Sequence, residues 1–227
     1  MAISGHQPAP DQPGDGGLAH SDAPEHDWAA ASAHVFPALR PVGTHGVQMS
    51  ELEPSQLAQE GTKKHALALL DPGPADLATA YVLRTAVYDV VINADHLLTW
   101  GVGPDTLRDT AIANLRAWSD GAAWSDELSD GRHLLSSDTG DGGDAARILL
   151  PEVRRHLAGE CGGPARVLVA LPDRDLLVAG SLNPGDADFA AQLAAFVGDV
   201  VEDANEPIDR RLFELVGDQH ELVPFGG

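Results

Sequence analysis

The sequence has few basic residues and a large excess of acidic ones. Its 227 residues include 14 Lys and Arg against 35 Asp and Glu, so the formal net charge is -21. Nucleic-acid backbones and anionic membranes attract clustered positive charge, and this balance therefore disfavours both as partners. A basic protein surface is the partner that such a charge predicts, although an acidic surface also serves solubility or salt tolerance without any partner.

Cysteine is scarcer still, since Cys161 is the only one in the chain. No disulfide can form within one molecule, which fits a reducing cytoplasm. The residue stands in Gly159-Glu-Cys-Gly-Gly at the end of a predicted helix. There the neighbouring carboxylate and the negative end of the helix dipole raise the pKa of a thiol. We therefore expect no nucleophilic role for Cys161.

Long apolar runs and a signal sequence are also missing. No run approaches the ~18 apolar residues of a membrane span. The N-terminal MAISGHQPAP has neither the basic nor the apolar segment of a signal peptide. These features predict a soluble, cytoplasmic protein.

The sequence lacks the common motifs of catalysis and cofactor binding. It contains no Walker A loop, no G-x-S-x-G and no H-E-x-x-H, and segment 101–106 lacks the third glycine of a dinucleotide fingerprint. The acidic loop 138–144 resembles a calcium loop only superficially, because an EF-hand would need an acid or Asn at Gly140 and Glu at Leu149. We expect Asp144 to cap a helix instead, and we predict no metal and no cofactor.

Composition divides the chain into two parts. Residues 1–55 are rich in Pro, Gly, Ala and acid, with few large aliphatics, so burial cannot offset their ordering entropy and we predict a disordered arm. Residues 56–227 are predicted to form a single α+β domain, with a mixed or antiparallel sheet built from hairpins and three to four packed helices. Four scattered histidines show no local pairing, which leaves open whether they converge on a metal: His65, His96, His133 and His156.

Local patterns place several elements within the domain. Apolar runs at 77–83 and 86–92 predict one hairpin, and those at 167–171 and 176–179 predict a clearer one with Pro172 in its turn. The other expected elements are helices at 93–101, 103–118, 151–159 and 186–203 and a final pair of strands around Phe213 and Leu222. The first of these helices is expected to end at Gly101.

The helix predicted at 186–203 has a continuous apolar stripe. Its members are Phe189, Leu193, Phe196, Val197, Val200 and Val201. Their spacing of i, i+4, i+7, i+8, i+11 and i+12 is typical of a helix face that packs on a core. We therefore expect Phe196 to be buried.

Three segments resemble a known family. They are NADHLLTWGVGPDTLRDTAIANL (93–115), GDGGDAARILLPEV (140–153) and LPDRDLLVAG (171–180). In this order they resemble the bacterial family Domain of Unknown Function 1444, the YtpQ-like proteins, over about residues 77–213. The resemblance implies an α+β fold but no activity, because the family has none that can be carried over. By this likeness the positions of interest are Trp100, Gly101, Asp141, Asp144, Arg147, Pro172, Arg174 and Asp175.

Charged residues around two predicted loops form the candidate binding site. They are Asp141, Asp144 and Arg147 near the acidic loop and Asp173, Arg174 and Asp175 at the hairpin tip. Caps and a solvated turn explain most of them without any function, and we predict no catalytic residue. The expected function is a non-catalytic protein-binding module of an adaptor, chaperone-like or immunity-like kind. The alternative is an enzyme of unknown reaction with a site built from loop 138–144 and turn 172–175, which a pocket uniting the two would favour.

Overall fold

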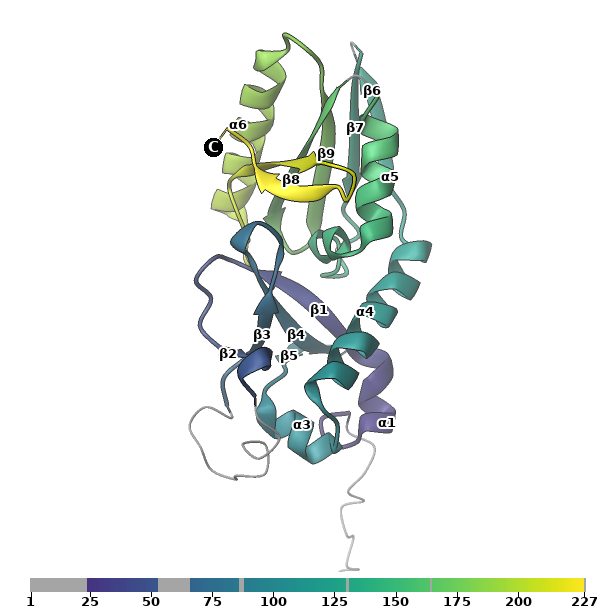
Figure 1. Ribbon diagram of the computed structural model, residues 1–227, viewed down its shortest axis with the longest axis vertical. Coiled ribbons are helices and arrows are strands. Elements are labelled where there is room, and N and C mark those ends of the chain that lie inside the picture. The colour runs from purple at the N-terminus through teal and green to yellow at the C-terminus, as the bar shows by residue number, and fades with distance from the viewer. Residues whose placement is uncertain (1–23, 53–65, 86–87, 130, 164, 227) are drawn as a thin grey trace, which may run out of the picture.

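The computed structural model describes residues 24–52, 66–85, 88–129, 131–163 and 165–226. In these ranges the chain forms an α+β fold with two β-sheets and five α-helices. The helices are α1 (Trp28–Ala31), α3 (Ala94–Trp100), α4 (Pro104–Gly121), α5 (Pro151–Cys161) and α6 (Ala187–Asp203). Figure 1 shows the two sheets towards opposite ends of the long axis. The expected α+β class is confirmed, but the described part has one more sheet and one more helix than predicted.

The five-stranded sheet is formed by the N-terminal half of the chain. Its strands are β1 (Val35–Arg40), β2 (Val47–Gln48), β3 (Leu69–Pro72), β4 (Ala78–Arg84) and β5 (Asp89–Val91). Strand β4 pairs antiparallel with β1, β3 and β5, whereas β2 pairs parallel with β3. The central position of β4 suits its sequence, ATAYVLR, because aromatic and β-branched side chains pack well on a pleated surface.

The six-stranded sheet is antiparallel throughout. Its strands are β6 (Ser125–Ser129), β7 (Arg132–Ser137), β8 (Arg166–Asp173), β9 (Leu176–Leu182), β10 (Leu212–Val216) and β11 (Glu221–Pro224), in the spatial order β11-β10-β8-β9-β7-β6. Side chains of β8 alternate between the two faces. Val167 and Val169 share a core cluster with Leu157 of α5, whereas Leu168 shares another with Leu193 of α6. Helices α5 and α6 therefore cover opposite faces.

Helix α4 connects the two cores. Pro104 begins the helix, where its missing N–H would have no partner in any case. Leu107 and Ala111 pack in the cluster of the five-stranded sheet, and Leu115 packs in the cluster of the six-stranded sheet. Residues four apart lie on one helix face, so the same face of α4 contacts both cores in succession.

Residues 24–52 correct the predicted arm. They contain α1 and β1, and Val35, Ala38 and Leu39 of β1 are buried. Sequence analysis missed β1 because Pro37 is unusual within a strand. Proline is tolerated here because β1 lies at the edge of its sheet, where one side of the strand needs no backbone donor. Residues 1–23 of the predicted arm lie outside the described residues.

The predicted burial of Phe196 is wrong. Helix α6 buries Phe189, Leu193 and Val197, whereas Phe196 is 45% exposed. Successive residues in an α-helix are rotated by about 100°, so Phe196 lies about 100° from Val197 and on the same side as Phe189, at the border of the face that packs on the sheet. The buried stripe is therefore narrower than the apolar pattern in the sequence.

The predicted hairpins and helix ends are mostly present. Strands β4 and β5, β8 and β9, and β10 and β11 pair antiparallel. Helix α3 ends at Gly101, whose φ of 67° is the left-handed conformation expected of a glycine cap. Pro172 lies inside β8 instead of the turn, and the chain reverses at Arg174 and Asp175. No helix in the described ranges is long and apolar enough to cross a membrane.

Candidate functional site

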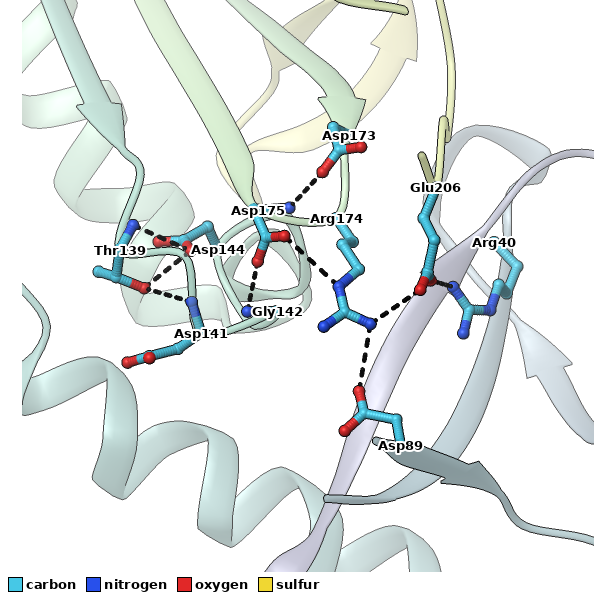
Figure 2. A network of polar contacts seen from close by, with 10 residues as sticks. All are labelled: Arg40, Asp89, Thr139, Asp141, Gly142, Asp144, Asp173, Arg174, Asp175 and Glu206. Atoms are coloured by element: carbon cyan, nitrogen blue, oxygen red, sulfur yellow. Dashed lines mark hydrogen bonds and ion pairs between the residues drawn. The ribbon is translucent and has the colours of Figure 1, made fainter. Parts of the chain in front are cut away.

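The acidic loop 138–144 and the turn between β8 and β9 lie against each other (Figure 2). The backbone N–H of Gly142 donates to a carboxylate oxygen of Asp175, and the N–H of Ala145 donates to the carbonyl oxygen of Arg174 at 3.1 Å. Gly142 has a φ of 73°, and a Cβ at this position would lie 2.7 Å from Nη2 of Arg174. Both the backbone conformation and the close approach therefore favour glycine here.

Arg174 is the centre of a charged network that joins the two sheets (Figure 2). Its Nη1 lies 3.3 Å from Oδ2 of Asp89 in β5 and 3.0 Å from Oε1 of Glu206, and its Nε lies 3.5 Å from Oδ2 of Asp175. Nη1 of Arg40 in β1 donates to the other Glu206 oxygen at 2.8 Å. Burial disfavours the charged form of Arg174, but the three carboxylates outweigh burial and raise its pKa. Arg174 therefore stays charged and holds β5 near the turn.

Asp175 is the carboxylate of this network whose pKa is shifted upwards. Partial burial raises the pKa, and the N–H of Gly142 and the charge of Arg174 lower it. The negative charges of Asp173 and Asp144 raise it again, and the net direction is upwards. An acid of this kind holds its proton to a higher pH than a solvated one, and shifted carboxyl groups in clefts occur at sites of proton transfer.

Arg84, at the end of β4, is a second guanidinium beside the network. Its Cζ lies 4.1 Å from the centroid of the Phe36 ring. Its Nε and Nη2 are buried and have no hydrogen-bond partner among the described residues. Burial lowers the pKa of Arg84, the charge of Asp89 raises it, and the like charge of Arg174 lowers it. Stacking on Phe36 and the charges of Asp89, Asp141 and Asp175 oppose the cost of burying this cation.

Asp144 and Arg147 lie on the inner side of the same loop, away from solvent. Asp144 occupies the predicted N-cap position, before the 3-10 helix Ala145–Leu149. Its side chain forms no cap hydrogen bond and instead accepts from the hydroxyl groups of Ser137 and Thr139. Arg147 donates from Nη1 to Oγ of Ser137 at 2.7 Å and from Nε to Oγ of Ser119 at 2.9 Å. Burial lowers the pKa of Arg147 to about 10, and Asp144 partly opposes this. Both residues therefore anchor the loop.

An open cleft of about 920 Å³ lies where these elements meet. Its lining consists of Arg40, Arg84, Thr85, Tyr88, Asp89, Val91, Gly140, Asp141, Asp173, Arg174, Asp175, Asn205 and Glu206. Five carboxylates against three guanidiniums make this lining acidic. Asp141 is exposed and Asp173 is half-buried, and neither forms an ion pair with another described residue. The cleft thus has negative charge that the described residues do not neutralise.

The predicted site residues divide into two groups. Those that line the cleft are Asp141, Asp173, Arg174 and Asp175, and those buried behind the loop are Asp144 and Arg147. Four further charged residues of the cleft were not predicted from the sequence, namely Arg40, Arg84, Asp89 and Glu206. Arg84 and Asp89 flank a predicted hairpin bend, which was the only sequence signal for them. Arg40 and Glu206 lie far away in the sequence and had no such signal.

The other titratable groups do not extend the site. In the ranges that the structure describes, no group of three or more His, Cys, Asp or Glu is placed to hold a metal ion. Nε2 of His133 lies 2.7 Å from a carboxylate oxygen of Asp126 on the neighbouring strand. Burial raises the pKa of the Cys161 thiol to about 11, with smaller contributions from Asp126 and Glu160. The predicted direction is confirmed, but burial is the main cause.

Comparisons with known proteins identify no relative of this chain. No family model matches it, no curated protein matches it, and no solved structure matches it. The function is therefore argued from the cleft.

Proposed function

We propose that the protein is a non-catalytic binding module that takes a basic segment of a partner protein into the cleft between the two sheets. The observation that carries this proposal is the acidic lining, in which Asp141 and Asp173 form no ion pair with another described residue. A Lys or Arg side chain of the partner supplies the missing positive charge. The net charge of -21 favours the same class of partner, because long-range attraction speeds encounter with a basic surface.

The position of the two acceptors supports recognition of a cation. Asp173 accepts the N–H of Asp175 at 2.9 Å within the turn, and Asp175 in turn accepts the N–H of Gly142 in the acidic loop. These bonds fix the relative position of the loop and the turn, so less freedom is lost when a ligand binds. Tyr88 lines the same cleft and is 61% exposed, so its ring offers a face on which a guanidinium can stack.

The test compares two double variants with equal change of charge. Binding of a fluorescent oligo-arginine peptide is measured by anisotropy with the wild-type protein, with Asp141→Asn plus Asp173→Asn, and with Asp199→Asn plus Asp218→Asn. The control pair is exposed and lies outside the cleft lining. We expect the cleft variant to bind about tenfold more weakly and the control to differ by less than about twofold. An oligo-glutamate peptide should not bind.

The dependence of affinity on salt, compared with the two double variants, distinguishes binding at the cleft from a general effect of net charge. Affinity of the wild-type protein for oligo-arginine should fall as ionic strength rises, because salt screens the attraction. Equal weakening in the two double variants would show that only the overall charge matters, and the cleft would then lose its role. Binding to oligo-glutamate would contradict the proposal directly.

A second candidate function is catalysis in the same cleft, and the raised pKa of Asp175 favours it. The structure unites loop 138–144 with the β8–β9 turn in one cleft, which is the arrangement expected of the enzyme alternative. Asp175 would then transfer a proton beside the charge of Arg174. A panel of chromogenic ester, phosphate-ester and glycoside substrates tests this candidate. Turnover that disappears in Asp175→Asn while the fold is retained would establish it, and turnover unaffected by this substitution would exclude Asp175.

Three other expectations stay predictions beside this proposal. They are the resemblance to the YtpQ-like proteins, the cytoplasmic location and the single-domain organisation. Helix α4 supports the last of these, because Leu107 and Leu115 belong to the cores of different sheets. A helix shared in this way links the unfolding of one core to that of the other.

A further inference from the structure

A second concave surface lies on the six-stranded sheet beside α6, and it shares no lining residue with the cleft. This groove of about 520 Å³ is lined by Glu127, Arg132, Leu134, Ser136, Asp138, Leu176, Val178, Phe189, Gln192, Leu193 and Phe196. Its walls come from α6 on one side and from β9, β7 and β6 on the other. In Figure 1 α6 lies at one side of the sheet and β6 and β7 lie at the other.

The groove exists because α6 covers only part of this sheet face. Leu193 and Val197 of α6 pack with Leu168 and Ala170 of β8. Strands β7 and β6 are the next positions beyond β9 in the sheet. Neighbouring strands are about 4.8 Å apart and a helix is about 10 Å wide, so two strands present a strip of the width of one helix. Among the described helices, α6 is the one with residues in the core cluster on this face.

Apolar side chains line the groove on both sides. Leu134 and Leu176 are only partly buried by the α6 cluster, and Phe196 of α6 is 45% exposed. An exposed aromatic residue that faces a concave apolar strip is typical of an interaction surface. Phe196, which the apolar stripe predicted to be buried, thus belongs to this second apolar surface and not to the core.

We infer that this groove binds an amphipathic helix of a partner protein that has Lys or Arg beside its apolar stripe. The backbone groups of β7 and β9 already pair with neighbouring strands, so an extended segment would find no backbone partners over them. A helix satisfies its own backbone and needs only a groove lined by side chains. An additional helix beside α6 would complete the layer that covers this face of the sheet.

Charge specifies the polar part of the partner helix. Glu127 and Asp138 are exposed at the groove and are acidic. The one basic residue in the lining, Arg132, already pairs with both carboxylate oxygens of Asp186 at 2.7 and 2.6 Å. The groove therefore offers negative charge beside apolar surface, which complements a helix with Leu or Phe on one face and Lys or Arg at its borders.

Charge also disfavours two occupants supplied by this chain. Residues 1–23 contain Asp11, Asp15 and Asp22 and no Lys or Arg, so this segment would add negative charge to an acidic groove. A second copy would bring its own α6, a helix with no Lys or Arg and with several acids. Like charges at an interface oppose association. A basic partner helix is the occupant that the groove favours.

The test uses a synthetic helix of Leu and Lys with Leu at i, i+3, i+4 and i+7. Its fluorescence anisotropy and circular dichroism are followed on addition of the full-length protein. The matched variants are Phe196→Ser in the groove and Val216→Ser outside it, because these residues are 45% and 44% exposed and neither is needed for a buried core. We expect the peptide to become helical and Phe196→Ser to weaken binding about tenfold, while Val216→Ser leaves it within about twofold.

Further variants test the predicted chemistry and its independence from the cleft. The Leu/Lys peptide should bind Glu127→Lys with a dissociation constant about tenfold higher than that for Asp218→Lys. The second variant makes the same change of charge outside the groove. A Leu/Glu peptide should not bind. In the Asp141→Asn plus Asp173→Asn background, which weakens the cleft, a Leu/Lys peptide with Leu spread around the helix should bind about tenfold more weakly than the amphipathic one. In that same background Phe196→Ser should still weaken binding of the amphipathic peptide about tenfold, so failure of the cleft proposal and failure of this one can be told apart.

Two results would overturn the inference. Equal binding by Phe196→Ser, Val216→Ser and the wild-type protein would place the peptide elsewhere on the acidic surface. Sedimentation of the protein alone as a dimer that Phe196→Ser converts to a monomer would show that a second copy occupies the groove.

Discussion

The Gly-rich loop 138–144 separates two charged clusters that use the same residue types in opposite ways. On its inner side Asp144 and Arg147 are 0% and 2% exposed and are bonded to neighbouring hydroxyl groups. On its outer side Asp175 and Arg174 are half-buried and face the open cleft. A carboxylate or guanidinium near the same loop is thus either buried as a structural anchor or left accessible from the cleft.

The comparison also separates stability from recognition. The inner cluster is desolvated, and its charges are tolerated only because hydroxyl groups and carbonyl oxygens surround them. The outer cluster keeps water nearby, and its ion pairs contribute little to stability because they are screened. Its carboxylates remain accessible, so a charged ligand can exchange with water at little cost to the fold.

The largest expected effect comes from removal of the inner guanidinium. Arg147→Ala should lower the free energy of unfolding by about 3–5 kcal/mol, because Asp144 would stay buried without its compensating charge. The packing of Arg147 on the Trp124 ring, 3.8 Å from the centroid, would be lost as well. The matched control is Arg174→Ala, which should cost about 1 kcal/mol or less. Urea unfolding monitored by circular dichroism measures both, and equal losses would end the distinction between the clusters.

An intermediate effect is expected at the two glycines of the loop. Gly140 and Gly142 have φ values of 75° and 73°, so alanine at either position should cost about 1–2 kcal/mol. The structure has nothing within 4 Å of a Cβ at Gly140, whereas a Cβ at Gly142 would lie 2.7 Å from Nη2 of Arg174. Gly142→Ala should therefore cost about 1 kcal/mol more, because Arg174 must move and lose its ion pairs. Equal urea midpoints for the two variants would mean that the contact with Arg174 does not hold the turn.

Local signals in the sequence predicted much of the fold. Gly101 in a left-handed cap and the apolar runs that became β8 and β9 identify their elements because the signal lies within a few residues. Strand β1 was missed because Pro37 is compatible with a strand only at a sheet edge, and edge position is a property of the tertiary structure. Burial of Phe196 was overpredicted because an apolar stripe does not show how wide a helix face the sheet covers.

Only those parts of the candidate site whose residues are close together in the sequence could be predicted. Loop 138–144 and the β8–β9 turn attract attention through their own glycines and charges. The cleft also needs Asp89 and Glu206, which are 85 and 32 residues away from Arg174. No pattern within a short window reports such pairings, because they depend on how the two sheets are joined. Burial of the Nε and Nη2 atoms of Arg84 likewise depends on the tertiary structure, so the sequence could not predict it.

The smallest expected effect is the pH dependence contributed by Asp175. Because its pKa is raised above the ordinary value of 3.8, the folded protein binds this proton more tightly than the unfolded chain does. Its contribution to stability is therefore lost as pH rises from 3.8 through the raised pKa, and it is flat above that. In urea unfolding at a series of pH values, the wild-type protein should lose stability relative to Asp175→Asn over this interval. The effect should be modest because the side chain is 35% exposed and solvent screens its charge. Asp218→Asn, at an exposed position outside the cleft, corrects for the general change of charge. A difference that grows in the opposite direction would mean that Arg174 and the N–H of Gly142 outweigh burial at Asp175.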